Sequence, residues 1–494
     1  MKRREALPQR GAGDGGATLE SGTPARTQVN PANRARPRQV TKKLTRKLTK
    51  KSTKKSTKKS TNKRRIELLA VWHIASALTF GSLAASASSQ PAHSPDATLI
   101  ARGEYVARAA DCAGCHTSVG GAAYAGGLGL ASPFGTIVST NITPERRYGI
   151  GAYSYADFER ALRKGVAPGN KRLYPAMPYP SFSKLTDDDV QALYAYFMRA
   201  VQPVAKPNQP TKVPFPFNQR WALYFWQLAF LPTQPYQPKP GRDVQWNRGA
   251  YLVQGAGHCG TCHTPRGLGY QEKGYDESSS DWLTGGVNDH WFAPNLTGDP
   301  GAGLGRIGAQ DLAAFLRTGH GAGLAAFGSM VEQVEDSTQY LTDDDALAIA
   351  HYLKSLPAQK PAGRYDPHAR PDPSTRNGNR VDPPQTLGAR VYTSFCARCH
   401  GSEGMGVTEV FPRLAGNPAV IAEDTTSLIR LLVEGGNSPS TLHGPPRQSM
   451  PGFAHDLTNP QMAAVLTWIR TSWGNDAQPV TANDVRTLRE KLHK

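Results

Sequence analysis

Six cysteines occur in the 494-residue chain, and all of them fall in one pattern, Cys-x-x-Cys-His. Two thiols at this spacing can form thioether bonds to the two vinyl groups of one haem, and the histidine that follows can bind the iron as its proximal ligand. The pattern therefore predicts three covalently bound haem c groups. The three copies are Cys112-Ala-Gly-Cys115-His116, Cys259-Gly-Thr-Cys262-His263 and Cys396-Ala-Arg-Cys399-His400.

Two other uses of a Cys-x-x-Cys pair fit this sequence less well. A structural zinc ion needs four ligands, and each copy supplies only two cysteines and one histidine. A thioredoxin-like redox pair does not need a histidine directly after its second cysteine. Haem attachment is the interpretation that uses all three residues of every copy.

Each motif is followed by a methionine, 61, 67 and 50 residues after the motif histidine. A thioether is a suitable sixth ligand for haem iron, and ligation by histidine and methionine raises the reduction potential. Met177 and Met450 are each followed by a proline, which fixes the loop, whereas Met330 is not. We predict Met177, Met330 and Met450 as the distal iron ligands.

The remaining candidates are interpreted differently. Met198 and Met462 fall in the helix expected at the end of their repeat, where methionine usually fills core space. Met405 follows His400 by only five residues, which places it near the proximal side of the haem. The alternatives to Met330 are His258, His290 and His320.

The sequence around the motifs is repeated as well. Arg102-Gly103-Glu-Tyr105 matches Arg248-Gly249-Ala-Tyr251, and Asn141-Ile-Thr143 matches Asn295-Leu-Thr297. Leu185-Thr-Asp-Asp-Asp matches Leu341-Thr-Asp-Asp-Asp, with Leu457-Thr-Asn-Pro-Gln as a looser third copy. We infer three copies of one unit of about 100 residues. They are module 1 (95–202), module 2 (241–357) and module 3 (385–475).

The last segment of each module has the clearest helical pattern. Thr186 precedes three aspartates, a favourable helix start, and apolar residues such as Leu193 and Phe197 follow at helical spacing. Segments 341–356 and 458–473 repeat this scheme. Each module is therefore predicted to be a set of helices around one haem, and the predicted fold class is all-α.

At this point a family resemblance is visible. The chain resembles the three-haem cytochrome c subunit of bacterial membrane-bound dehydrogenases of the alcohol, gluconate, sorbitol and fructose dehydrogenase type. The residues that carry the resemblance are the loop Leu173-Tyr-Pro-Ala-Met-Pro-Tyr-Pro-Ser-Phe and the segment 337–357, and the likeness covers roughly residues 98–475. The resemblance implies three tandem class I-like cytochrome c domains.

The resemblance also implies an electron-transfer role. In such complexes a separate catalytic subunit, with a flavin or a quinone cofactor, oxidises a sugar, a sugar acid or an alcohol, and the cytochrome subunit passes the electrons to membrane ubiquinone. The sequence has no Gly-x-Gly-x-x-Gly opening a helix after a strand, so no catalytic residue is predicted. Two alternatives stay open: a free periplasmic multihaem carrier, and a peroxidase-like haem enzyme in which the haem at Met330 lacks its sixth ligand.

The net charge of +19 is concentrated at the N-terminus. The first 90 residues contain 21 Lys and Arg and 4 Asp and Glu; of the totals of 58 and 39, the rest of the chain has 37 and 35. A nearly neutral body argues against a nucleic-acid surface on the folded part. Residues 1–65 are predicted to be a disordered basic extension. A nucleic-acid tail and a translation start further downstream are the alternatives.

An export signal is predicted next. Lys63-Arg64-Arg65 precede an apolar run that ends at Leu83, and small residues follow up to Ser88. This order predicts a signal peptide over 66–87, cleaved after Ala87, with an uncleaved anchor helix as the alternative. In a bacterium, the remainder is expected on the periplasmic side of the cytoplasmic membrane, attached peripherally.

Two proline-rich linkers, 203–240 and 358–384, are expected to run over the surface of packed modules. The first contains the aromatic segment 221–231, which is too short to span a bilayer. Its composition suits an interface with lipid or with the catalytic subunit, or packing between modules 1 and 2. Polar replacement of Trp221, Phe225 and Phe230 is predicted to release the protein from membranes. Residues 476–494 are expected to form a polar tail.

Overall fold

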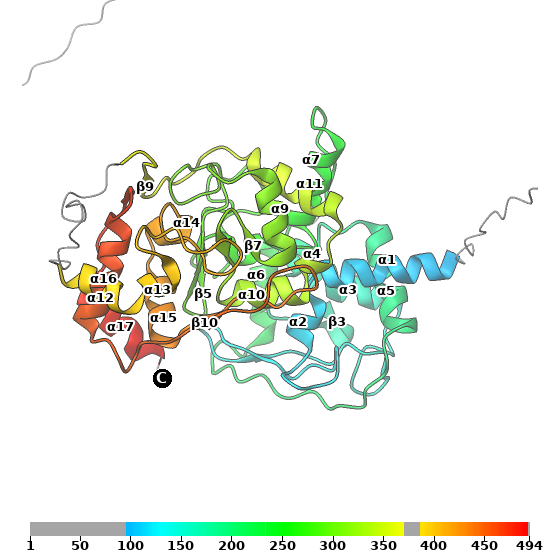
Figure 1. Ribbon diagram of the computed structural model, residues 1–494. Helices are drawn as coiled ribbons and strands as arrows, with labels where there is room; N and C mark the ends of the chain where they lie inside the picture. Colours follow the sequence, from blue (N-terminus) through cyan, green and yellow to red (C-terminus); the bar gives the residue numbers. More distant parts are fainter. Residues whose placement is uncertain (1–94, 233, 370–385, 493–494) are drawn as a thin grey trace, which may run out of the picture. The chain divides into compact units, whose positions relative to one another are not determined.

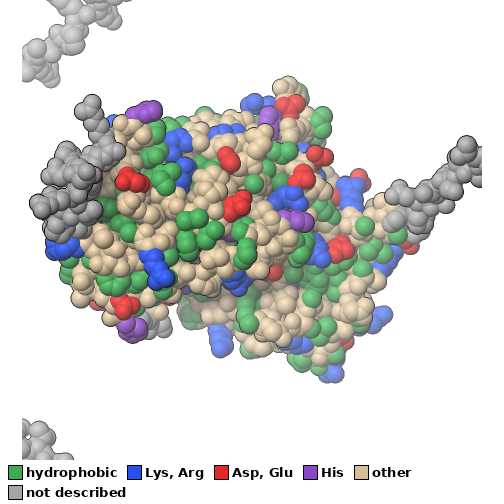
Figure 2. Space-filling model, viewed as in Figure 1, with side chains coloured by type: hydrophobic (Ala, Val, Ile, Leu, Met, Phe, Trp, Pro, Cys, Tyr) green, Lys and Arg blue, Asp and Glu red, His purple; other side chains and the backbone are tan. Residues whose placement is uncertain are grey.

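The computed structural model describes residues 95–232, 234–369 and 386–492. The predicted basic extension, the signal peptide and the end of the second linker lie outside the described residues. On the face drawn in Figure 2, Lys and Arg side chains are interspersed with Asp and Glu side chains. This distribution fits the nearly equal numbers of basic and acidic residues after residue 90.

Module 1 begins and ends with its longest helices, which pack against each other (Figure 1). Its helices are α1 (Pro95–Ala109), α2 (Cys112–His116), α3 (Tyr155–Lys164), α4 (Tyr179–Phe182) and α5 (Asp187–Arg199). The predicted start at Thr186 is confirmed, because its side chain accepts a hydrogen bond from the backbone N–H of Asp189.

Modules 2 and 3 repeat this order. Module 2 contains α7 (Val244–Gln254), α8 (Gly260–His263), α9 (Ala309–Thr318), α10 (Ser329–Asp336), η3 (Thr338–Tyr340) and α11 (Asp343–Lys354). Module 3 contains α12 (Leu387–Phe395), α13 (Ala397–His400), α14 (Pro418–Ile421), α15 (Thr426–Glu434) and α16 (Asn459–Thr471). The segment predicted as a polar tail forms α17 (Ala482–Leu492), whose Val485 and Leu488 are buried in the core of module 3.

Short antiparallel ladders join the loops between these helices. They are β1 (Gly129–Leu130) with β2 (Ile137–Val138), β3 (Val166–Ala167) with β4 (Lys171–Arg172), β5 (Gly286–Asn288) with β6 (Trp291–Ala293), β7 (His320–Gly321) with β8 (Leu324–Ala325), β9 (Arg364–Tyr365) with β12 (Asn475–Asp476), and β10 (Gly436–Asn437) with β11 (Ser449–Met450). Each ladder pairs only two or three residues. The described fold is therefore helix-rich, and the helices carry its cores.

The first and last long helices of every module cross at a glycine. A Cβ atom added to Gly103, Gly249 or Gly388 would overlap the backbone carbonyl oxygen of the partner helix. The carbonyls belong to Ala192, Ala348 and Ala464 in modules 1, 2 and 3. The helices can approach this closely because neither residue at the crossing has a side chain larger than a methyl group.

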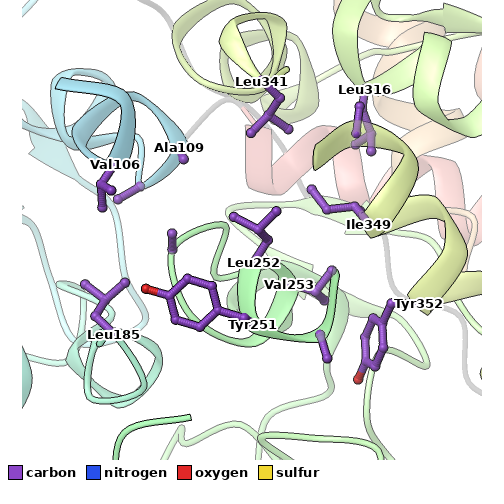
Figure 3. Packing of buried hydrophobic residues seen from close by; sticks show 14 of the residues in the cluster. Val106, Ala109, Leu185, Tyr251, Leu252, Val253, Leu316, Leu341, Ile349 and Tyr352 are labelled. Atoms are coloured by element: carbon purple, nitrogen blue, oxygen red, sulfur yellow. The ribbon is translucent and has the colours of Figure 1, made fainter. Parts of the chain in front are cut away.

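Modules 1 and 2 share one hydrophobic core, and module 3 has its own. Figure 3 shows Tyr251 of module 2 pointing toward Leu185 of module 1, and Ala109 of module 1 and Leu252 of module 2 belong to the buried side chains around it. Burial of these apolar side chains stabilises the two modules as a pair.

Modules 1 and 2 each contribute one tyrosine that donates a hydrogen bond to an aspartate of the other module. The Tyr105 hydroxyl donates to the Asp345 carboxylate of module 2 at 2.5 Å, and the Tyr251 hydroxyl donates to the Asp189 carboxylate of module 1. Each carboxylate also accepts from an arginine of its own module, Asp189 from Arg102 and Asp345 from Arg248. The Arg-Gly-x-Tyr segment of each module thus contacts the Leu-Thr-Asp-Asp-Asp segment of the other module.

Between modules 1 and 2, η2 (Arg220–Ala222) continues into α6 (Leu223–Phe230). The Gln227 side chain donates to the carbonyl of Lys164 in module 1, and the Trp226 indole N–H donates to the carbonyl of Gly269 in module 2. The predicted packing of this segment between the two modules is therefore confirmed for its inner face. Its outer face is described under Proposed function.

Candidate haem-binding sites

The three Cys-x-x-Cys-His motifs occupy the same structural position. Each lies in a short helix, α2, α8 or α13, that directly follows the first long helix of its module. No disulfide bond joins any of the six cysteines. Within the described ranges, no group of three or more His, Cys, Asp and Glu side chains is arranged to hold a metal ion.

Each motif histidine has the same hydrogen-bond partner type. The Nδ1 atoms of His116, His263 and His400 lie 2.6, 2.7 and 2.9 Å from backbone carbonyl oxygens. A carbonyl only accepts, so Nδ1 carries the hydrogen and Nε2 keeps a free lone pair. Burial lowers the pKa of all three rings, which favours the neutral form that binds iron.

The accepting carbonyls were not predicted from the sequence, although a repeat marks two of them. They belong to Thr140 and Pro294, which directly precede the repeated Asn-x-Thr segments. The Asn141 amide donates to the carbonyl of Val204, 2.8 Å away, and the Asn295 amide donates to that of Gln359, also at 2.8 Å. These asparagines therefore anchor the loop that orients the histidine to the chain that follows the last helix.

Module 3 reaches the same geometry with a different residue. The accepting carbonyl belongs to Pro412, and no Asn-x-Thr follows it. Instead Asn475 in β12 donates to the carbonyl of Leu414 and accepts from the backbone N–H of Gly416. In module 3 the anchoring asparagine therefore lies beyond the last helix and binds the loop, whereas in modules 1 and 2 it lies in the loop and binds the chain beyond the last helix.

A cavity of about 270 Å³ lies beside the motif of module 2. Both His263 and Met330 line it. Its wall is largely apolar, as a flat hydrophobic macrocycle requires. The apolar lining includes Leu252, Phe292, Leu304, Leu316, Ile349 and Leu353. The donor set and the wall of this cavity thus fit a haem that is bound through Cys259 and Cys262.

The predicted distal methionines lie in different local structures. Met177 lies in the loop before α4 and packs partly buried against the core of modules 1 and 2. Met450 lies in β11 and packs partly buried against the core of module 3, as Cys396 does. Met330 lies in the first turn of α10, after Gly328 at φ 58°. Helix geometry rather than a proline fixes the position of Met330.

The other candidates are placed as follows. Met462 is fully buried in the core of module 3, and Met405 is 55% exposed. His258 lines the module 2 cavity, and its ring lies close to the backbone of Ala110 in module 1. His290 and His320 are not among the residues that line this cavity. Of the three alternatives to Met330, only His258 therefore reaches the cavity.

All three modules contribute to the wall of the module 2 cavity. Ala109 comes from module 1, and Asn417, Pro418 and Ala419 come from module 3. On the module 1 side, the thiols of Cys115 and Cys262 lie close enough for the charge of one to raise the pKa of the other. The attachment motif of module 2 therefore lies beside that of module 1, and its cavity is bordered by the α14 region of module 3.

Asp111, directly before the first motif, is a half-buried acid with one buried carboxylate oxygen, and the sequence did not single it out. It has φ 48°, and burial together with the charge of Asp336 raises its pKa to about 8. One of its carboxylate oxygens has no hydrogen-bond partner among the described residues. Neither the residue type nor its position in the sequence signals this burial.

A helical module that presents a neutral histidine from a Cys-x-x-Cys-His helix, next to an apolar wall and a methionine, defines a c-type cytochrome domain. The family model for cytochrome c matches residues 100–200, 247–357 and 385–473, and the chain belongs to this family. It carries three covalently bound haem c groups.

Comparison with similar proteins shows which members of the cytochrome c family this chain resembles. The chain is 48% identical over 424 residues to the cytochrome c subunit of a quinone alcohol dehydrogenase from Gluconacetobacter polyoxogenes, covering 84% of this chain and 89% of the relative. It is 46% identical over 398 residues to the gluconate 2-dehydrogenase cytochrome c subunit of Pantoea cypripedii, covering 79% and 90%. It is 38% identical over 416 residues to the fructose dehydrogenase cytochrome subunit of Gluconobacter japonicus, covering 81% and 83%. The predicted resemblance to cytochrome c subunits of dehydrogenases is confirmed.

Proposed function

We propose that the protein is the electron-transfer subunit of a membrane-associated dehydrogenase complex. It takes electrons from a catalytic subunit with a flavin or a quinone cofactor and passes them to ubiquinone. The observation that carries this proposal is the threefold motif geometry, with every histidine held at Nδ1 by a carbonyl. Haem supplies one-electron chemistry, and the chain holds three haems in class I-like helical modules over 95–202, 241–357 and 385–475.

In this proposal each haem has one set of ligands from its own module. Cys112 and Cys115, Cys259 and Cys262, and Cys396 and Cys399 form the thioether bonds. His116, His263 and His400 are the proximal iron ligands, and Met177, Met330 and Met450 are the distal ones. The module 2 cavity, which both His263 and Met330 line, gives this assignment its most direct support.

Replacing a distal methionine by leucine tests the assignment. Leucine keeps the volume but removes the sulfur, so Met177→Leu, Met330→Leu and Met450→Leu are each expected to convert one of the three haems to a high-spin form. Electron paramagnetic resonance of the oxidised protein measures this conversion. Met462→Leu is the control, because Met462 is buried in a core. A low-spin Met330→Leu protein would point to His258 as the ligand.

Purification from native membranes tests the partner. A tagged full-length protein, extracted in mild detergent, is expected to bring with it one stoichiometric dehydrogenase that contains a flavin or a quinone cofactor. Mass spectrometry identifies that subunit. Recovery of the protein alone from the soluble fraction contradicts the subunit proposal and favours a free periplasmic carrier.

We propose that α6 attaches the protein to the periplasmic side of the cytoplasmic membrane. Among the described residues, no helix combines the length and the apolar character needed to cross a bilayer. The outer face of the α6 region is nonetheless strongly apolar, with Trp221 67%, Phe225 61% and Leu228 74% exposed. We call these residues, together with Phe217 and Tyr224, the aromatic face.

The charges around the aromatic face favour lipid over a protein partner. Residues 190–242 contain no Asp or Glu, whereas basic residues occur throughout this stretch. The Arg172 guanidinium lies 4.7 Å from the ring centroid of Tyr224, and that of Arg220 lies 4.4 Å from that of Tyr174. Tryptophan and tyrosine beside basic side chains suit the head-group region of an anionic membrane.

Polar replacement of the aromatic face is expected to release the protein from membranes. The variant combines Trp221→Ser, Phe225→Ser and Leu228→Ser, and flotation with anionic vesicles measures binding. Phe230, part of the set predicted from the sequence, is left intact because it is only partly exposed and its ring packs on Gly269. Leu442→Ser, at a 71% exposed leucine of module 3, is the control. Undiminished flotation of the triple variant with full haem content contradicts the attachment.

A further inference from the structure

The hairpin formed by β5 and β6 bears on both sides of the haem site of module 2. Strand β6 ends directly before Pro294, whose carbonyl oxygen lies 2.7 Å from Nδ1 of His263. On the other side, a Cβ atom added to Gly328 would lie 2.6 Å from the ring of Trp291 in β6. The chain just before Met330 therefore packs directly on this tryptophan. One hairpin thus contacts the segments that carry the proximal and the distal ligand.

The turn of this hairpin has an unfavourable backbone conformation. Its two residues, Asp289 and His290, have φ values of 44° and 57°. Positive φ at both positions matches the twist of a two-residue hairpin, but this region of φ favours glycine, and neither residue is glycine. Backbone of this kind persists where the surrounding structure holds it. The hairpin is therefore expected to need support from outside itself.

Helix α15 of module 3 provides this support. The Ser427 hydroxyl accepts a hydrogen bond from the backbone N–H of Phe292 at 2.8 Å and donates one to the carbonyl of the same residue at 3.1 Å. One turn later in α15, the Arg430 guanidinium donates to the carbonyl of Asp289 and lies 4.4 Å from the ring centroid of Trp291. Ser427 is only 3% exposed, so removing its hydroxyl would leave these backbone groups without their partner in a buried place.

Module 1 supports its equivalent hairpin in a different way. There β2 ends two residues before Thr140, whose carbonyl oxygen lies 2.6 Å from Nδ1 of His116. Thr136, directly before β2, exchanges two backbone hydrogen bonds with Lys212, at 2.8 and 3.0 Å. Lys212 belongs to the linker that follows module 1. The support in module 1 therefore comes from the adjacent chain, whereas in module 2 it comes from side chains 135 residues further on.

The hairpin also separates the haem site from solvent. Trp291, Phe292 and Ala293 line the apolar cavity of module 2, and α14 of module 3 completes the wall. Oxidised haem iron carries one more positive charge than reduced iron, and water stabilises that charge. Exclusion of water therefore favours the reduced form and raises the reduction potential.

We propose that Ser427 and Arg430 of module 3 are positioning residues for the haem of module 2. They hold the β5–β6 hairpin, whose carbonyl end orients His263 and whose tryptophan supports the chain before Met330. The reduction potential of this haem thereby depends on module 3 as well as on module 2. The inference rests on the proposed function, which makes His263 and Met330 the iron ligands.

Redox titration of the purified full-length holoprotein, followed by haem absorbance, tests the proposal. Ser427→Ala removes both hydrogen bonds to the hairpin and admits water. It is expected to lower the potential of one of the three haems so that its ratio of oxidised to reduced form rises about tenfold, which is about 59 mV for one electron. In a Ser427→Ala, Met330→Leu double variant, the shifted haem is expected to be the high-spin one. Thr441→Val is the matched control, because the Thr441 hydroxyl also joins module 3 to module 2, at the Thr318 carbonyl.

Cyanide binding to the oxidised protein gives a second readout, on the distal side. Cyanide binds ferric haem when the methionine leaves the iron. Arg430→Met removes the guanidinium from the turn and from the Trp291 ring, so cyanide is expected to bind one haem in three about tenfold faster than in the wild type. Thr441→Val is expected to bind cyanide as the wild type does.

Three results would each overturn the proposal. They are unchanged potentials of all haems in haem-replete Ser427→Ala protein, a shift confined to a low-spin haem of the double variant, and unchanged cyanide binding in haem-replete Arg430→Met protein. The ligand assignment is tested separately. A low-spin Met330→Leu protein contradicts the proposed distal ligand, whereas a high-spin one whose potential does not respond to Ser427→Ala contradicts only the positioning role.

Discussion

Gly249→Ala is expected to destabilise modules 1 and 2 by about 3 kcal/mol or more, the upper part of the range for overpacking a core. Gly249 lies where α7 crosses α11, and the added methyl group would overlap the Ala348 carbonyl oxygen. Backbone atoms in a packed helix cannot move aside as a flexible side chain can. The direction of the effect is informative, because in an isolated helix the same change stabilises by about 1 kcal/mol.

Denaturant unfolding of the holoprotein, followed by haem absorbance and by circular dichroism, measures this loss. Gly436→Ala is the matched control, because the nearest atom to its added methyl group is the end of the Leu431 side chain at 3.1 Å. Equal midpoints for the Gly249→Ala protein and the wild type would show that the two helices do not cross at this residue.

Asp345→Asn gives the second large effect, together with a dependence on pH. The Asp345 carboxylate accepts from Arg248 at 2.6 and 2.7 Å and from the Tyr105 hydroxyl at 2.5 Å. These partners lower its pKa in the folded protein despite the opposing effect of burial. Removing the charge is expected to cost about 2–3 kcal/mol at neutral pH, less than for a fully buried ion pair because Arg248 remains partly in water.

The sign of the pH dependence follows from the lowered pKa. The carboxyl group releases its proton more readily when folded, so its stabilisation is complete above the unfolded value of about 4 and is lost as pH falls through the folded value. Unfolding free energies of the wild type and of Asp345→Asn are therefore expected to converge as pH falls below about 4. Asp344→Asn is the control, because Asp344 lies in the same turn and forms no ion pair with any residue that the structure describes. A constant difference at all pH values would contradict the assignment.

The haem-attachment residues can be predicted from the sequence because they lie next to one another in the chain. Two cysteines separated by two residues and followed by a histidine indicate thioether bonds and a proximal ligand without any knowledge of the fold. The repeats around the motifs likewise predict three modules and the helix that begins after Thr186. Haem attachment and helix capping each involve only a few neighbouring residues, so both can be predicted from short sequence patterns.

Contacts made over long distances in the chain were not predictable in the same way. Asp189 and Asp345 were interpreted as favourable charges at a helix start, which is true of their neighbours Asp187 and Asp343 as well. Only the fold shows that the third aspartate of each run binds an arginine of its own module and a tyrosine of the other. The backbone carbonyls that orient the motif histidines leave no mark in a side-chain pattern, and only the repeated Asn-x-Thr pointed to two of them.

The hydrogen bonds of Tyr105 and Tyr251 between the modules limit when the pair of modules can close during synthesis. A chain that is synthesised from its N-terminus presents module 1 first. The partner of Asp189, Tyr251, follows 62 residues later, and the partner of Tyr105, Asp345, follows 240 residues later. Until then, the apolar side chains of module 1 that belong to the shared core have no cover. The shared core of modules 1 and 2 is therefore complete only after the chain has been made as far as Asp345.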